Sequence, residues 1–348
     1  MNFDRFLLKT YINMSRLLAI GDIHIRMDNI EDIHLFIEKL EQVIIQEKPH
    51  LIILLGDILH THERIHTICL QYAQKVFEMC SSHVPTYVLV GNHDYISNSQ
   101  FLTSQHWMTP FSRWRNLTIV DRVTSITHDS HTFIACPYVP DGRFVEALNT
   151  VDTWKTANMI FGHQTLDGVK MGAIVAEHVE AWLPEYPFLC SGHIHDKQVI
   201  QPNLYYTGTP MQHAFGEKRN KSIALFTVSD KVEYKEIELR VSLKRIEYMT
   251  ISEAMTYTLN VEPHESVRLT IRGSKEECRV FRKTSVYQHL IQKAKVVLDE
   301  LVHEKEESSD TTHTFHQVLY DAVKNNYFMT CLYKRHASLP FAPDIEFV

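Results

Sequence analysis

The stretch Tyr87-Val88-Leu89-Val90-Gly91-Asn92-His93-Asp94 guides the interpretation of the whole chain. An apolar, β-branched run that ends in Gly-Asn is typical of a buried strand arriving at a turn. The turn carries an amide, an imidazole and a carboxylate in three consecutive positions. Because ligands collect beyond the carboxyl ends of strands in open α/β sheets, we predict that this turn belongs to a site.

Four further apolar segments end in glycine followed by side chains of similar chemistry. Their ends read Gly21-Asp22-Ile23-His24, Gly56-Asp57-Ile58-Leu59-His60, Gly162-His163 and Gly192-His193-Ile194-His195. Apolar runs without alternation are typical of strands covered on both faces. Apolar residues at helical spacing over 29–47 and 65–80 predict helices between the first three strands. This alternation predicts βαβ units and an α/β fold with a largely parallel sheet.

The rest of the chain falls into smaller segments. Strands are predicted over 117–120, 132–136, 205–206, 223–228 and 234–239, and a helix over 101–114. After about residue 240, strands are predicted over 245–251 and 267–271, and helices over 286–301 and 315–323, separated by a polar linker. We therefore predict an N-terminal extension over 1–13, a catalytic domain over 14–240, a small α+β domain over 241–305 and a helical tail over 306–348.

The composition is that of an ordinary soluble globular protein, with 44% apolar and 22% charged residues. No apolar run approaches the roughly 20 residues that cross a bilayer, and the N-terminal residues lack signal-peptide features. The six cysteines are scattered without a CxxC pair, which favours free thiols in a reducing compartment. The net charge of −7 means that any nucleic-acid-binding surface must be local.

The polar strand ends together predict a metal centre. Of three Asp-x-His pairs, only Asp22 and His24 follow a predicted buried strand. The pair Asp32 and His34 lies in a helical stretch, where i and i+2 do not share a face, so we interpret these two as surface or core residues. The pair at 129 and 131 lies in a polar turn, so we interpret it as solvated. Carboxylate, imidazole and amide ligands without thiolate suit Mn²⁺, Fe or Zn²⁺ in a hydrolase. The number of ligands is enough for two ions that share a carboxylate.

In this order, D-x-H, G-D, G-N-H-D, G-H and G-H-x-H resemble the calcineurin-like metallophosphoesterases over residues 17–195. The resemblance implies a two-sheet αββα sandwich and a dinuclear centre. It assigns Asp22, His24 and His195 to one ion, Asn92, His163 and His193 to the other, and Asp57 to a bridge. It implies that His93 faces the phosphate without binding metal. Asp94 would then orient His93, or else stabilise the turn.

Three features are similar to the SbcD (meiotic-recombination-eleven) nucleases. Gly56 to His60 matches G-D-x-x-H, which implies that His60 lies near the substrate phosphate, and residues 206–217 resemble the Y-x-G-[ST]-P…F-G-E segment. Lys221-Ser222 matches a K-[SG] pair, and residues 267–273 resemble a strand of the small DNA-binding capping domain. The resemblance implies a Mn²⁺-dependent DNA exonuclease and single-strand endonuclease at DNA ends in repair, recombination or replication. A hydroxide bound between two metal ions would attack phosphorus. Besides Mn²⁺, the candidate ions are Mg²⁺, Fe and Zn²⁺.

Partners follow from the same resemblance. DNA would contact basic residues after the last metal motif, namely Lys218, Arg219, Lys221, Lys244 and Arg245. Glutamates interspersed among them leave an ordinary mixed-charge surface equally open. An SbcC-type SMC-like ATPase would bind the helix at 286–301 or the one at 315–323, although an amphipathic helix more often packs on a core. Whether the protein forms a homodimer is left open by the sequence.

Two other functions use the same motifs. A phosphatase or cyclic-nucleotide phosphodiesterase would share the metal centre and turn over small phosphoesters without cutting DNA. A non-catalytic scaffold subunit would lack ligands, and all seven are present here. We expect a cytoplasmic, DNA-associated protein, and the sequence leaves a viral or phage origin open.

Overall fold

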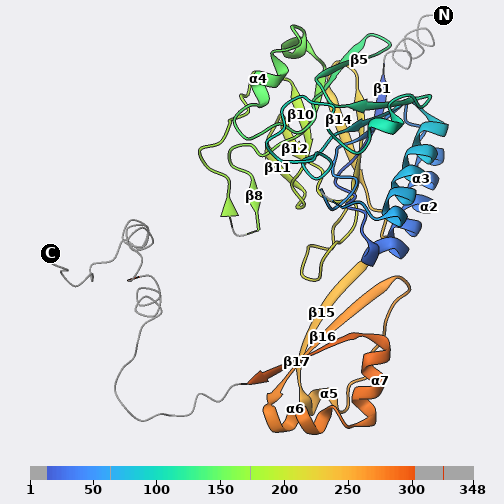
Figure 1. Ribbon diagram of the computed structural model, residues 1–348, viewed down its shortest axis with the longest axis vertical. Coiled ribbons are helices and arrows are strands. Elements are labelled where there is room, and N and C mark those ends of the chain that lie inside the picture. Colours follow the sequence, from blue (N-terminus) through green and yellow to red (C-terminus); the bar gives the residue numbers. More distant parts are fainter. Residues whose placement is uncertain (1–13, 63, 173, 302–323, 325–348) are drawn as a thin grey trace, which may run out of the picture. The chain divides into compact units, whose positions relative to one another are not determined.

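The computed structural model describes residues 14–62, 64–172, 174–301 and 324 (Figure 1). The predicted extension over 1–13, the linker and the helix at 315–323 lie outside the described residues. The first of two compact units, Met1–Glu300, contains the elements below, and the last strand ends one residue beyond it.

No helix in the described part of the chain combines the length and the apolar character that a bilayer-spanning helix needs.

The first sheet has six strands in the order β14-β13-β1-β2-β3-β4. Its parallel half comprises β1 (Ser15–Ile20), β2 (Leu51–Leu54), β3 (Thr86–Leu89) and β4 (Leu117–Val120). The strands β13 (Ile223–Val228) and β14 (Val232–Ile237) extend it in antiparallel fashion beside β1. The helices α2 (Ile30–Glu47) and α3 (Thr67–His83) pack on one face of this sheet through side chains such as Phe36 and Phe77.

The second sheet also has six strands, in the order β11-β12-β10-β7-β6-β5. They are β11 (Gln198–Gln201), β12 (Leu204–Tyr206), β10 (Phe188–Gly192), β7 (Met159–His163), β6 (His131–Ala135) and β5 (Thr124–His128). One face packs against α4 (Phe144–Leu148) and the short helix Trp154–Thr156. A two-stranded hairpin of β8 (Lys170–Met171) and β9 (Ile174–Val175) follows β7.

A buried apolar layer joins the two large sheets. It includes Leu17 and Ile53 from the first sheet and Phe133 and Phe161 from the second, all with no exposed surface. Apolar area removed from water contributes roughly 25 cal/mol per Å², so this layer is a major source of stability. The predicted two-sheet αββα sandwich is confirmed.

A third sheet has its own small core. Its strands are β15 (Leu243–Thr250), β16 (Glu265–Ser274) and β17 (Lys295–Leu301), in that order. The helices α5 (Ile251–Ala254), α6 (Lys275–Phe281) and α7 (Ser285–Lys293) contribute to a core with Val267, Leu269 and Ile271. The domain boundary at residue 240 stays a prediction; it falls between the end of β14 and the start of β15.

The structure contradicts two predicted helices. The segment 286–301 is α7 followed by β17, because Ala294 is extended and Val296-Val297 continues as a strand. Apolar residues at 290, 291, 294, 297 and 298 fit a helical stripe by coincidence. The segment 101–114 contains only the 3₁₀ turn Thr109–Phe111, with Pro110 in its first turn. Of the two helices proposed for an ATPase partner, the first is therefore half as long as predicted.

The prediction that His131 is exposed to solvent is also wrong. His131 is buried on β6, and its Nδ1 lies 2.9 Å from the Ser15 hydroxyl. Sequence analysis also missed β5, which pairs with β6. The five cysteines in the described residues are free and buried, as expected for a reducing compartment.

Candidate metal centre

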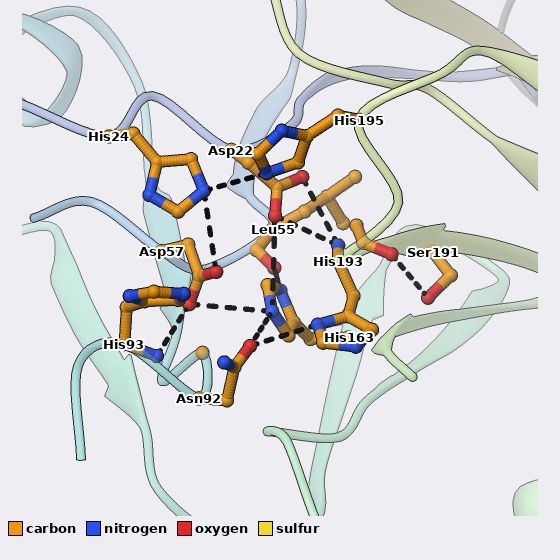
Figure 2. A network of polar contacts seen from close by, with 12 residues as sticks. Asp22, His24, Leu55, Asp57, Asn92, His93, His163, Ser191, His193 and His195 are labelled. Carbon is orange, nitrogen blue, oxygen red and sulfur yellow. Dashed lines mark hydrogen bonds and ion pairs between the residues drawn. The ribbon is translucent and has the colours of Figure 1, made fainter. Parts of the chain in front are cut away.

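The carboxyl ends of β1, β2, β3, β7 and β10 bring all seven predicted metal ligands together (Figure 2). Parallel pairing within each sheet aligns these ends. Two groups of side chains could each hold an ion: Asp22 with His24 and His195, and Asp57 with His163 and His193.

In the first group two imidazoles face each other. His24 Nε2 lies 3.0 Å from His195 Nε2, and the Asp57 carboxylate approaches the same His24 nitrogen at 3.6 Å through Oδ2. Two ring nitrogens that converge in this way are arranged like ligands of one cation. A single proton shared between them is the alternative when no cation is bound.

In the second group an amide oxygen takes the central position. Asn92 Oδ1 lies 3.1 Å from His163 Nε2 and 2.9 Å from His193 Nδ1. Asp57 reaches this group through its other oxygen, because Oδ1 lies 3.4 Å from His163 Nε2. Each oxygen of Asp57 therefore faces a different group, which is the geometry expected of a bridging carboxylate (Figure 2).

Backbone groups orient the side chains of the site. His163 Nδ1 lies 2.6 Å from the Leu55 carbonyl and donates to it, which leaves Nε2 free as a ligand. The amide of His193 donates to Asp22 at 2.9 Å, and the amide of His93 donates to Asp57 Oδ1 at 2.8 Å. Second contacts of this kind fix ligands before a metal arrives.

Strained backbone is concentrated at the same place. His24, Asp57 and His193 have φ values of 47°, 51° and 77°, in the left-handed region that non-glycine residues rarely adopt. Each such residue costs of the order of 1 kcal/mol or more, so the surrounding fold must hold it. Gly91 permits the close approach of two strand ends, because a Cβ there would lie 2.2 Å from Asp57 Oδ1.

The electrostatics suit cations. Burial alone would raise the pKa of Asp57, but His163 and its hydrogen bond hold that pKa well below the usual range. Burial raises the pKa of Asp22, and the nearby Asp57 charge adds to the effect. Burial likewise lowers the pKa of His193 to about 3. Burial would lower the pKa of His163, but the Asp57 and Asp22 carboxylates raise it to about 9. A divalent ion would therefore replace a proton on His163, and the two buried carboxylates and the imidazole nitrogens provide the charge and donors that such an ion needs.

The predicted phosphate-facing residues lie beside this centre. The His93 ring is 5.0 Å from the His24 ring and stacks on His60 at 5.5 Å, with an interplanar angle of 10°. His93 Nδ1 lies 2.8 Å from the His60 carbonyl and donates to it, so Nε2 is left for a substrate. Both imidazoles are half-buried. With His24 they form a third group close enough to hold an ion.

The contacts of Asp94 favour the turn-stabilising role over the predicted catalytic one. Its buried carboxylate accepts hydrogen bonds from the amides of Ile58, Leu59 and Gly91, and from the indole of Trp107 at 2.9 Å. Burial raises the pKa of Asp94 to about 7. Asp94 therefore ties the second and third strand-end turns together, which is the alternative that sequence analysis left open.

Two of the five predicted DNA-binding cations are engaged within the fold. Lys221 is buried, with Nζ 3.0 Å from both Glu217 and the His195 carbonyl. Lys244 Nζ donates to the Gln212 carbonyl and lies 3.1 Å from Asp32. We therefore do not include Lys221 and Lys244 in a DNA-binding surface.

The other three predicted cations also have acidic partners. Arg245 pairs with Glu247 and lies 2.8 Å from Glu265. Lys218 and Arg219 also lie beside acidic side chains, but more than half of each side chain is exposed.

Sequence analysis missed three contributors to the site. His213 is buried with its ring 5.5 Å from His24, and its Nε2 lies 3.2 Å from the Asp22 carbonyl. The Leu55 carbonyl and the Tyr138 ring, 5.8 Å from His193, complete the surroundings. The motif Met211-Gln212-His213 was visible in the sequence, but nothing in its spacing linked it to Asp22.

The fold and the site define a hydrolase of the metal-dependent phosphoesterase class. Residues 15–197 match the family model described as calcineurin-like phosphoesterase, which is more than half of the chain. The chain belongs to this family. Family members use dinuclear metal sites, and the two groups described above are where two ions would bind.

Two viral proteins are similar over most of their length. One, named "Putative phosphoesterase 244L", from Invertebrate iridescent virus 6, is 41% identical over 78% of this chain and 98% of its own. Another, "Putative phosphoesterase 078R" from Invertebrate iridescent virus 3, is 39% identical over 80% of this chain and 82% of its own. Among solved structures, GAP50 from Plasmodium is 14% identical over 84% of this chain and 98% of its own, with a TM-score of 0.41, too distant to bear on function.

Proposed function

We propose that the protein is a metal-dependent DNA nuclease of the SbcD type, which hydrolyses phosphodiester bonds at DNA ends. The observation that carries the proposal is the stacked pair of His60 and His93 beside His24. His60 comes from the G-D-x-x-H motif, which resembles that of SbcD nucleases. This pair supplies a second imidazole next to the predicted phosphate position.

The two imidazoles have separate roles in the proposed reaction. Two bound divalent ions, for which we favour Mn²⁺, would supply Lewis-acid polarisation of the phosphate and an activated water. His93 would hold a proton at Nε2 for the leaving oxygen, since its Nδ1 is occupied by the His60 carbonyl. His60 would contact a non-bridging phosphate oxygen.

The third sheet supports a nucleic-acid substrate. Val267, Leu269 and Ile271 face the helices, so the alternate residues Arg268, Thr270 and Arg272 lie on the opposite face of β16. Tyr248 is paired with Thr270 in the register of β15 and β16, and 65% of its surface is exposed. The Arg272 guanidinium lies 6.0 Å from its ring.

Polar atoms on this face lack partners within the protein. Arg268 Nε and Thr270 Oγ1 are buried and have no hydrogen-bond partner among the described residues. Unsatisfied buried polar groups are rare, so each one calls for an explanation, such as local strain or an ordered water or ion. The exposed Tyr248 ring and the exposed Arg272 side chain, which also pairs with Asp299 at 2.9 Å, are groups that nucleic-acid strands contact by stacking and phosphate binding.

The test is cleavage of DNA by purified protein with Mn²⁺. We expect degradation of linear duplex and single-stranded DNA, and a loss of roughly 10²–10⁴-fold in His93→Ala. Calorimetric Mn²⁺ titration should give the same stoichiometry for His93→Ala and the wild type, because the proposal gives His93 no ligand role. Tyr248→Ala should weaken DNA binding but leave the hydrolysis of small aryl phosphodiesters unchanged.

Three results would count against the proposal. Turnover of small phosphoesters without DNA cleavage would favour the phosphatase or cyclic-nucleotide phosphodiesterase alternative. Binding of DNA without any hydrolysis in the presence of Mn²⁺, Mg²⁺, Fe²⁺ or Zn²⁺ would favour a scaffold. Loss of one bound ion in His93→Ala would move His93 into the metal centre, in line with the third group of residues close enough to hold an ion. An ATPase partner stays a prediction, which co-purification from cells would test.

A further inference from the structure

A cavity of about 640 Å³ opens directly beside the metal centre. The candidate ligands His193 and His195 line one side of it. The hairpin residues Lys170 and Met171 and the loop residue Phe215 line the rest, together with Ile194, Asp196 and residues 216–218. Its volume lies within the roughly 300–1,000 Å³ of small-ligand sites.

The lining suits a flat, uncharged group better than an anion. Phe215 is half-buried, and Met171 is 42% exposed. Most of the charged groups around the cavity already have partners: Lys218 Nζ lies 3.1 Å from Asp196, and Glu217 pairs with Lys221. Lys170, which is exposed at the hairpin, has no ion pair among the described residues. A second phosphate at Lys218 would therefore compete with an existing ion pair, whereas an aromatic base would cover the exposed apolar surface of Phe215 and Met171.

Both walls of the cavity are held in place before any ligand binds. On the hairpin side, the Gln198 carboxamide accepts from the Lys170 amide at 3.0 Å and donates to its carbonyl at 2.9 Å. On the loop side, the Glu217 carboxylate accepts from the amides of His213 and Ala214 at 3.1 and 3.2 Å. Fixed walls reduce the ordering that binding would otherwise require.

We propose that this cavity holds the base of a nucleotide attached to the phosphate at the metal centre, with Phe215 and Met171 contacting its faces. This proposal rests on the proposed nuclease function, and it names a substrate subsite. A base can enter such a pocket only when it is unpaired, so the enzyme would act on single-stranded DNA or on frayed ends. The stacking would be tolerant of sequence, because every base has an aromatic face.

The experiment compares oligonucleotides with and without a base beside the scissile phosphate. Two single-stranded substrates carry a tetrahydrofuran abasic unit, one on the 5′ side and one on the 3′ side of a single cleavable phosphate. For the wild type we expect kcat/KM to fall roughly ten- to hundred-fold on one of the two, the range typical of one base–aromatic stack. The other substrate should be cleaved at the normal rate.

The kcat/KM of the variant Phe215→Ala on the complete substrate should fall by the same factor as that of the wild type on the sensitive abasic substrate. On that abasic substrate, Phe215→Ala should be no slower than the wild type. Phe215→Trp should keep the preference for the base. Ile45→Ala removes an exposed apolar side chain on α2, outside the cavity lining, and should behave like the wild type. Thermal melts of all variants check that folding is unchanged.

Equal cleavage of complete and abasic substrates by the wild type would overturn this inference while leaving the nuclease function intact. If DNA is not cleaved but a small aryl phosphodiester is, the proposed function itself has failed. A Phe215→Ala variant that still discriminates between the two substrates would place the base elsewhere.

Discussion

Replacing Gly91 by alanine should disable the metal centre through a change of a single methyl group. A Cβ at this position would lie 2.2 Å from Asp57 Oδ1 and 2.4 Å from the Asp57 backbone nitrogen. Side-chain rotation alone cannot relieve the second contact, because a backbone atom is involved. Since real Cβ contacts are essentially never shorter than 3.0 Å, the atoms must separate by at least 0.8 Å for the first contact.

The expected effects follow from that displacement. Asp57 faces both metal groups, so moving it misplaces both ions relative to the substrate. A misplacement of about 1 Å costs roughly 10²-fold in rate, and overpacking of this kind costs about 1–3 kcal/mol of stability. We therefore expect at least a hundredfold loss of kcat/KM, together with weaker Mn²⁺ binding and a melting temperature lower by roughly 2–12 °C.

The assay measures Mn²⁺-dependent hydrolysis of a small aryl phosphodiester, alongside calorimetric Mn²⁺ titration. Gly142→Ala is the matched control, because a Cβ there would meet nothing within 4 Å, although φ is +78°. Gly142→Ala should lose about 1 kcal/mol of stability and keep full activity. If Gly91→Ala binds Mn²⁺ and turns over like the wild type, Asp57 is not the shared ligand and the bridging assignment is wrong.

Three further predictions concern Asp94, the dependence of stability on the metal, and His50. Trp107→Phe removes one hydrogen-bond donor to Asp94, so we expect the free energy of unfolding in urea to fall by about 1–3 kcal/mol while catalysis is retained. An inactive but fully stable variant would contradict the structural role of Asp94. Chelation should lower the melting temperature, and Mn²⁺ at 100 times its Kd should restore about 2.7 kcal/mol; a melting temperature insensitive to Mn²⁺ would argue against these ligands. Burial and the stacked His128 lower the pKa of His50 below its usual 6.5. As the pH drops, His50 therefore takes up a proton more readily in the unfolded chain, so the free energy of unfolding should fall below about pH 6.5. The variant His50→Asn should flatten this pH profile.

The residue pattern was sufficient to predict an α/β fold and the gathering of ligands, while the two-sheet sandwich followed from the family resemblance. Each candidate ligand directly follows a buried strand, and parallel pairing places such positions at one edge of the sheet. Asp22, Asp57 and Asn92 could therefore be assigned to one site without coordinates. The periodicity of the first two helices was equally clear, and α2 and α3 differ from prediction by only a few residues.

Other features depend on contacts that sequence spacing does not encode. Asp94 follows His93 directly, yet its partners include backbone amides about 36 positions away and an indole 13 positions away. The segment 286–301 fits a helical stripe, but pairing with β16 turned its second half into a strand. His213 enters the site through a loop after the last motif, and only the folded chain brings it to Asp22.

The position of β13 has a consequence for synthesis of the protein. Ser15 on β1 pairs with Val228 on β13, so β1 is synthesised long before the neighbouring strand that covers one of its edges. At about 5–20 residues per second, a nascent chain would carry an incomplete first sheet for roughly 10–40 s. During this time the β1 edge next to β13 is open to pairing with other chains, which is a route to aggregation. Chaperones that cover this edge during translation should therefore raise the yield of folded protein.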